Sequence, residues 1–170
     1  MNVIAVIGSG RWSGKTTTIE SLTGELTRRG KKVGTIKQIH KEDFTLDTEK
    51  KDTWRHANAG ARIVVSAAPH EVAAMKRIEN ENWFNEAMNL LKGEDLDYVL
   101  IEGTPKREMP LIFAAGKVET AKKILKELKG ELVCISAFAP EEFDKAEFSV
   151  PVLHPTKDVK KMADLVEFIS

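Results

Sequence analysis

Near the N-terminus of the chain stands the stretch Val6-Ile7-Gly8-Ser9-Gly10-Arg11-Trp12-Ser13-Gly14-Lys15-Thr16-Thr17, which follows an apolar run and precedes a helical pattern. A glycine-rich turn between a buried strand and a helix directs backbone N–H groups inward, and the positive end of the helix dipole adds to them. Together these groups hold the phosphates of a nucleotide. The stretch therefore predicts a phosphate loop, and we expect residues 8–17 to bind the nucleotide.

Two side chains extend the chemistry of this loop. Lys15 would supply the cation at the terminal phosphates, and the Thr16 hydroxyl is placed to bind Mg²⁺. The usual pattern GxxxxGK[ST] puts Ser9 where a glycine is expected. Either Gly8 makes the opening turn of a longer loop, or Gly10 supplies the backbone freedom. The alternative, a glycine-rich turn with a surface lysine, fits less well because the flanking strand and helix are those the motif requires.

The composition sets broad limits on the function. A chain of 170 residues fits one α/β domain, here 1–170. The 26 basic residues equal the 26 acidic ones, so no net charge favours nucleic acid as a partner. The single cysteine, Cys134, lies in an apolar run and is most simply a core thiol. No apolar run reaches membrane-spanning length and no signal peptide precedes the first strand, so we expect a cytoplasmic protein without a membrane partner.

Strand-like and helix-like segments alternate along the chain. The pattern predicts strands at 2–7, 33–39, 62–67, 72–75, 98–101, 111–114 and 132–136, and helices at 16–29, 52–60, 82–91, 118–129 and from about 156. We expect the helix at 82–91 to bury its apolar face, which includes Phe84, Ala87, Met88 and Leu91. This alternation predicts an α/β protein with a mostly parallel central sheet flanked by helices, and the phosphate loop places it in the P-loop NTPase class.

Ligands of open α/β sheets lie outside the carboxyl ends of the strands, where this chain carries several polar groups. Glu102 stands at the tip of an apolar strand, the place for a second magnesium ligand or a water-orienting group, although a polar strand cap is an alternative. Glu102 and Lys15 are the predicted catalytic residues. Ser136 and Ala137 follow a late strand, and we expect the loop 136–140 to contact the nucleotide base.

Four further loop residues are weaker candidates for the site. Lys37 and His40 follow the second strand, and Asp47 lies in the polar loop after it. Each is as readily a solvated loop residue as a functional one. Asp52 precedes a helical turn and is first of all an N-cap that accepts backbone N–H bonds. The remaining histidines lack metal-ligand spacing, so a histidine or cysteine metal site is not expected.

The ordered set of motifs resembles the molybdopterin-guanine dinucleotide biosynthesis protein B (MobB) family. The motifs are the phosphate loop, Lys37-x-x-His40, Phe44-x-x-Asp47, Lys51-Asp52-Thr53, Ala59-Gly60-Ala61 and Ile101-Glu102-Gly103. The resemblance covers nearly the whole chain. It implies a P-loop protein that binds GTP, forms a homodimer, and assists the guanylyltransferase that attaches GMP to molybdopterin.

The chain departs from the family pattern at two sites. The family commonly reads Lys-His-x-His-His where this chain has residues 37–41 as Lys-Gln-Ile-His-Lys, and Glu-Gly-Phe-Lys where residues 102–106 read Glu-Gly-Thr-Pro-Lys. The guanine motif [NT]KxD is also missed by one residue at 156–159. No arginine finger or water-orienting glutamine is evident, with Gln38 and Arg11 the nearest candidates, so we expect weak or no intrinsic GTPase activity.

Two other functions share the fold class. A metallochaperone-type GTPase would carry a Cys/His metal motif, and a small-molecule P-loop kinase would need a basic lid, for which Lys106 and Arg107 are the compact candidates. For the homodimer, we expect the partner-facing surface near the loops 40–51 and 104–110, with Trp12 and Trp54 as aromatic anchors. The alternative is that both tryptophans pack inside the monomer.

Overall fold

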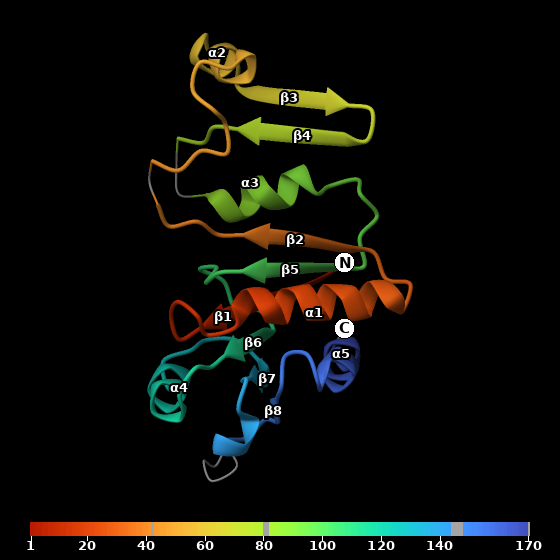
Figure 1. Cartoon of the computed structure of the whole chain (residues 1–170), viewed down its shortest axis with the longest axis vertical. Helices are drawn as coiled ribbons and strands as arrows, with labels where there is room; N and C mark the ends of the chain where they lie inside the picture. The colour runs from red at the N-terminus through yellow and green to blue at the C-terminus, as the bar shows by residue number, and fades with distance from the viewer. Residues whose placement is uncertain (42, 80–81, 144–147, 170) are drawn as a thin grey trace. The chain divides into compact units, whose positions relative to one another are not determined.

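The computed structural model of the chain describes residues 1–41, 43–79, 82–143 and 148–169. It divides into two compact units, one comprising Met1–Gln38 and Leu91–Ser170, the other Ile39–Leu90 (Figure 1). The phosphate loop belongs to the first unit. That the whole chain folds as one domain stays a prediction.

The first unit is built on a parallel six-stranded sheet. Its strands are β1 (Asn2–Gly8), β2 (Val33–Lys37), β5 (Tyr98–Glu102), β6 (Leu111–Ala114), β7 (Leu132–Ser136) and β8 (Val152–Leu153), in the order β2-β5-β1-β6-β7-β8. The strands at the centre are mostly apolar because both faces of the sheet are covered. The predicted fold, a mostly parallel central sheet flanked by helices, is confirmed.

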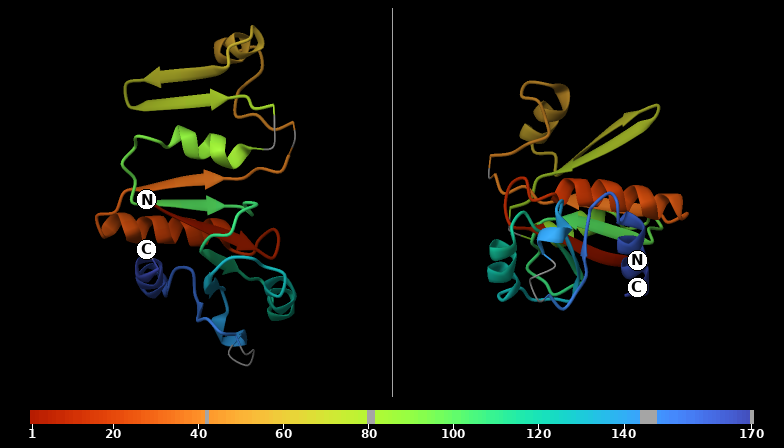
Figure 2. Two further views of the ribbon diagram at one scale, coloured as in Figure 1. Left: turned by 180° about the vertical axis from the view of Figure 1, so that it is seen from behind. Right: turned by 60° about the horizontal axis from the view of Figure 1, so that its bottom comes forward.

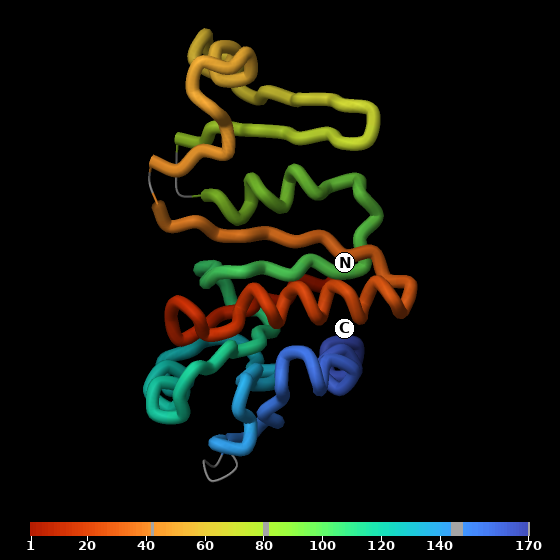
Figure 3. Tube along the Cα trace, viewed as in Figure 1, coloured from red at the N-terminus to blue at the C-terminus, as the bar shows by residue number. Residues whose placement is uncertain are grey.

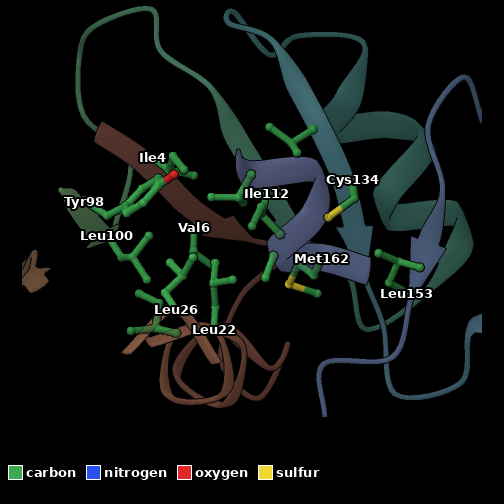
Figure 4. Packing of buried hydrophobic residues seen from close by; sticks show 14 of the residues in the cluster. Ile4, Val6, Leu22, Leu26, Tyr98, Leu100, Ile112, Cys134, Leu153 and Met162 are labelled. Carbon is green, nitrogen blue, oxygen red and sulfur yellow. The ribbon is translucent and has the colours of Figure 1, made fainter. Parts of the chain in front are cut away.

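Two helices cover one face of this sheet. They are α1 (Lys15–Arg28) and α5 (Val159–Phe168), which lie side by side (Figure 2). Alternate residues of β1 point to opposite faces, so Ile4 and Val6 meet the helices while Ala5 and Ile7 do not. Figure 4 shows this core, whose other members include Leu22, Leu26, Leu100, Ile112, Cys134, Leu153 and Met162. Burial raises the pKa of the Cys134 thiol to about 12, which makes it the inert core thiol expected.

The opposite face of the sheet carries a second apolar cluster. Phe113 and Ile135 of the sheet pack there with Ala121 of α4 (Val118–Leu125) and with Phe143. Phe143 follows a short 3₁₀ turn, Pro140–Glu142. The two termini of the chain lie at the same end of the first unit, away from the loop between β1 and α1 (Figure 3). In the described parts of the chain, no helix combines the length and apolarity needed to cross a membrane.

The second unit holds a separate hairpin. It contains α2 (Asp52–Asn58), the antiparallel strands β3 (Ile63–Ala68) and β4 (Glu71–Lys76), and α3 (Trp83–Leu90). Lys76 of β4 bonds to Glu86 of α3. The prediction that the apolar face of α3 is buried is wrong, because none of its residues is fully buried and Phe84, Ala87 and Met88 are only half-buried.

Several observed boundaries differ from the predicted ones by two residues or more. β2 ends at Lys37, two residues early, and α4 ends at Leu125 instead of reaching Gly130. The last helix begins at Val159 because a hydrogen-bonded turn occupies residues 154–158. β8, which has only two residues, was not predicted.

A partly buried ion cluster links α1 to α5. Glu25, only 7% exposed, accepts hydrogen bonds from Arg28 (2.7 and 2.8 Å) and from Arg29 (2.9 Å). Arg29 also donates to Asp164 and Glu167 of α5, at 2.7 and 2.6 Å. The hydrogen bonds from Arg28 and Arg29 lower the pKa of Glu25 from 4.5 to about 2.

This shift predicts a pH dependence of stability. A group whose pKa is lowered by folding stabilises the protein above its ordinary pKa, and this stabilisation is lost as the pH falls, here from 4.5 towards 2. Glu25→Gln should therefore lower the Tm at pH 7 and flatten the fall in Tm over that acidic range, measured by circular dichroism. Glu20→Gln, at an exposed position of the same helix, is the control. Identical Tm profiles for Glu25→Gln and the wild type would contradict the assignment.

Candidate functional site

The loop between β1 and α1 is anchored to the neighbouring strand β6. The Ser9 N–H donates to the carbonyl of Ala114 (3.2 Å), and the Ser9 hydroxyl accepts the N–H of Gly116 (3.1 Å). Gly10 has φ +137°, in the region that favours glycine. Of the two alternatives for the unusual first position, the structure therefore places the backbone freedom at Gly10, while Ser9 supplies the anchor.

The N-terminus of α1 opens onto this loop. Gly14, with φ +96°, is the N-cap residue, and no side chain caps the helix end. The first helical hydrogen bond runs from the Thr18 N–H to the Gly14 carbonyl (2.9 Å). The preceding N–H groups of the first turn have no intrahelical acceptor and carry the positive end of the helix dipole. This arrangement suits an anion such as phosphate.

The Lys15 side chain folds back over the loop. Its Nζ donates to the Gly10 carbonyl (2.7 Å) and lies 3.3 Å from the Ser13 hydroxyl. Ser13 is buried, and its hydroxyl donates to the same Gly10 carbonyl (3.1 Å). The ammonium group is therefore held against the backbone of the loop.

Thr16, Glu102 and Lys37 converge at the ends of β1, β5 and β2. The Thr16 hydroxyl lies 3.2 Å from both carboxylate oxygens of Glu102. Lys37 stands opposite Glu102 in the register of β2 and β5, and its Nζ lies 3.4 Å from Glu102 Oε1. The Glu102 side chain is 14% exposed, and that of Lys37 is 60% exposed. The parallel register thus brings Lys37 to Glu102, and Thr16 reaches the same carboxylate from α1.

The oxygen donors of this group suit Mg²⁺. Mg²⁺ is usually bound by one or two carboxylates together with phosphate oxygens and water, and not by a cage of protein ligands alone. The Thr16 hydroxyl and the Glu102 carboxylate provide such a partial set. Within the described residues, no group of three or more His, Cys, Asp or Glu side chains forms a metal cage. The residues present therefore fit a magnesium ion that shares its coordination with a nucleotide.

Gln38 fixes the segment that follows Glu102. The Gln38 N–H donates to the Glu102 carbonyl (2.8 Å), and the Gln38 side-chain oxygen accepts the N–H of Thr104 (2.9 Å). Gly103, between them, has φ +154°. The side-chain oxygen of Gln38 is thus engaged with the backbone, so Gln38 serves the conformation of this loop.

The loop after β7 also borders α1. The hydroxyls of Ser136 and Thr18 lie 2.8 Å apart and are buried, and the Ala137 N–H donates to the Leu153 carbonyl (2.9 Å). Both Ser136 and Ala137 are at most 1% exposed. The Ser136 side chain therefore joins β7 to α1, and the Ala137 backbone joins it to β8. The aromatic ring of the next residue, Phe138, is the exposed group of this loop.

The remaining candidates lie in the second unit. His40 is exposed. Asp47 Oδ1 accepts hydrogen bonds from the Thr53 hydroxyl (2.7 Å) and the Thr48 N–H (2.9 Å), so Asp47 orders the turn before α2. The prediction that Asp52 is the N-cap of α2 is wrong. Lys51 occupies that position, and Asp52 is the first helical residue, where its charge still complements the helix dipole.

Comparison with known proteins places this site in a family. Residues 3–139 match the family model described as molybdopterin guanine dinucleotide synthesis protein B (MobB). The chain belongs to the MobB family. This match confirms the resemblance seen in the sequence motifs. The family acts in molybdopterin guanine dinucleotide biosynthesis.

Two curated relatives carry a matching name. A Haemophilus influenzae molybdopterin-guanine dinucleotide biosynthesis adapter protein is 28% identical over 155 residues, which are 91% of this chain and 82% of that protein. A Methanocaldococcus jannaschii protein, provisionally named as the same adapter, is 40% identical over 104 residues, or 61% of this chain. The matched part spans 41% of the length of the archaeal relative.

Solved MobB structures share the fold. The Bacillus subtilis MobB structure has a TM-score of 0.75 at 24% identity and covers 99% of this chain and 97% of its own. A MobB homolog from Bacillus stearothermophilus has a TM-score of 0.73 at 22% identity, with 99% and 98% covered. These structures bear out the P-loop NTPase architecture of this MobB family member.

The geometry predicts the effect of removing the charge of Glu102. Glu102→Gln keeps the shape of the side chain but loses the anionic oxygens, so it should weaken magnesium-dependent nucleotide binding while the Tm changes little. Calorimetry with GTP, with and without Mg²⁺, measures the first effect and thermal unfolding the second. Glu119→Gln, at an exposed position of α4, is the control. A large fall in Tm with unchanged affinity would show that Glu102 is only a polar strand cap.

Proposed function

We propose that this protein is a GTP-binding accessory protein of molybdopterin guanine dinucleotide biosynthesis that assists the guanylyltransferase. The observation that carries the proposal is the contact of Thr16 with Glu102, next to Lys15 at an uncapped helix N-terminus. Membership of the MobB family indicates the pathway, molybdopterin guanine dinucleotide biosynthesis. We expect the protein to act in the cytoplasm, with a guanine nucleotide and the guanylyltransferase as its partners.

Each part of the site has a physical task in this proposal. The backbone of residues 8–14 and the first turn of α1 hold the phosphates through N–H groups, and Lys15 balances their charge. Thr16 and Glu102 hold Mg²⁺, which neutralises charge on the phosphate oxygens when it is bound. Lys37, 3.4 Å from Glu102, offsets part of the negative charge of that carboxylate.

Weak or no intrinsic hydrolysis follows from the surroundings of this site. Fast phosphoryl transfer to water depends on a group that orients the water and on an arginine that stabilises the transition state. The side-chain oxygen of Gln38 is bonded to the Thr104 N–H, and Arg11 is exposed on the phosphate loop. Lys15 and Glu102 are then the residues placed to contribute to any slow GTPase activity. No observation favours the metallochaperone or the kinase among the described residues.

The proposal is tested by removing the cation of the phosphate loop. Lys15→Ala should weaken GTP binding by about 2 kcal/mol, the scale of a charge-assisted hydrogen bond. Titration calorimetry of GTP with Mg²⁺ measures it. Lys122→Ala, at an exposed position of α4, should leave the affinity unchanged. Equal affinities of wild type and a folded Lys15→Ala protein, or no GTP binding by the wild type, would overturn the proposal.

A homodimer is the second part of the proposal. Trp12 is 97% exposed at φ +64°, so the alternative that it packs inside the monomer is wrong, whereas Trp54 is half-buried. An exposed tryptophan on the rim of the phosphate loop suits an aromatic anchor in an interface. Light scattering should give twice the 19.0 kDa chain mass, and Trp12→Ala should shift it towards the monomer. A wild type that stays monomeric at every concentration, with or without GTP, would exclude the dimer.

A further inference from the structure

An aromatic ring contacts the phosphate loop where the loop joins α1. Phe138 follows β7 and is 51% exposed, although large aromatic side chains are usually buried. Its ring approaches Gly14 so closely that a Cβ atom on Gly14 would lie 2.9 Å from Phe138 Cε2. The N-cap residue of α1 and the ring of Phe138 are therefore in contact, and part of the ring stays open to solvent.

The position of Phe138 is fixed from two sides. The preceding residues are held by the bond between the Ser136 and Thr18 hydroxyls and by the Ala137 N–H bond to β8. The ring also packs edge-on against His154, with a centroid distance of 5.8 Å and an interplanar angle of 81°. A ring held in this way loses little conformational entropy when a ligand packs against it.

His154 is itself held by the turn that follows β8. The ring atom Nδ1 of His154 lies 3.2 Å from the backbone N–H groups of both Thr156 and Lys157. The backbone N–H of His154 donates to Asp158 Oδ2 (3.0 Å). This backbone hydrogen bond lowers the pKa of Asp158. Asp158 is therefore engaged with the backbone of this turn. Its carboxylate stabilises local structure, so we do not assign it the base-binding role of the aspartate in the [NT]KxD motif.

We infer that Phe138 is the residue against which the base of the bound nucleotide packs, an inference that rests on the proposed nucleotide binding. The ribose joins the base to the phosphates, so the base must lie near the loop that holds them. Every nucleobase has a π-face that packs favourably on an aromatic ring. Trp12 also lies on this loop, but it is 97% exposed and has a strained φ, whereas Phe138 is already held in place.

The test compares a ligand that has a base with one that lacks it. Calorimetry with Mg²⁺ measures the affinity of the full-length wild type and of Phe138→Ala for GTP and for inorganic tripolyphosphate. Phe138→Ala should weaken GTP binding by about tenfold, within the range of base–aromatic stacking, and leave tripolyphosphate binding unchanged. Phe138→Trp should retain GTP affinity. Phe168→Ala, which removes an 89% exposed phenylalanine of α5, should change neither affinity.

A second variant separates stacking from support of the loop. Phe138→Leu keeps an apolar contact with Gly14 but has no aromatic face, so it should also lose GTP affinity while its Tm and tripolyphosphate affinity stay normal. Loss of both affinities in this variant would show that Phe138 only supports the phosphate loop. Unchanged GTP affinity in Phe138→Ala, or a selective loss in Trp12→Ala instead, would overturn the inference and leave nucleotide binding standing. A wild type that binds neither ligand would instead refute the proposed function.

Discussion

The site depends on the attachment of one short turn to the centre of the sheet. β1 pairs with β5 on one side and β6 on the other, so the loop that leaves it emerges between two strand ends. Ser9 ties that loop to the end of β6 by two hydrogen bonds. A turn anchored in this way keeps its N–H groups aimed at one place, which is the requirement for binding phosphate with backbone groups.

The acidic side of the site follows from the same sheet. Because all six strands are parallel, their carboxyl ends lie at one edge, and the register places Glu102 between β1 and Lys37 of β2. Lys37 and Thr16 both contact this largely buried carboxylate. Gln38 bonds to the Glu102 carbonyl and to the Thr104 N–H, so the backbone is held in place at Glu102 and directly after it.

Several elements were predictable because their signals are local. The apolar runs of β5, β6 and β7 are long enough to be recognised, and their observed bounds agree with the predicted ones to within one residue. β8 has two residues and carries no such signal. The start of α5 was misplaced because Asp158 and His154 form side-chain bonds to the backbone, which compete with the helix. The strands β3 and β4 are predicted by the sequence, but not the fact that they form a sheet of their own, since strand propensity does not reveal the partner of a strand.

The sequence by itself determined the phosphate loop, the α/β class and the family, because each depends on residue types at short and fixed spacing. Only the tertiary structure decided which distant residues meet. Thr16 and Glu102 are 86 positions apart, and Thr18 and Ser136 are 118 apart. The contact of Phe138 with Gly14 likewise had no signal in the motif. Such contacts depend on strand order and register, which follow from the packing of the whole sheet and not from any local pattern.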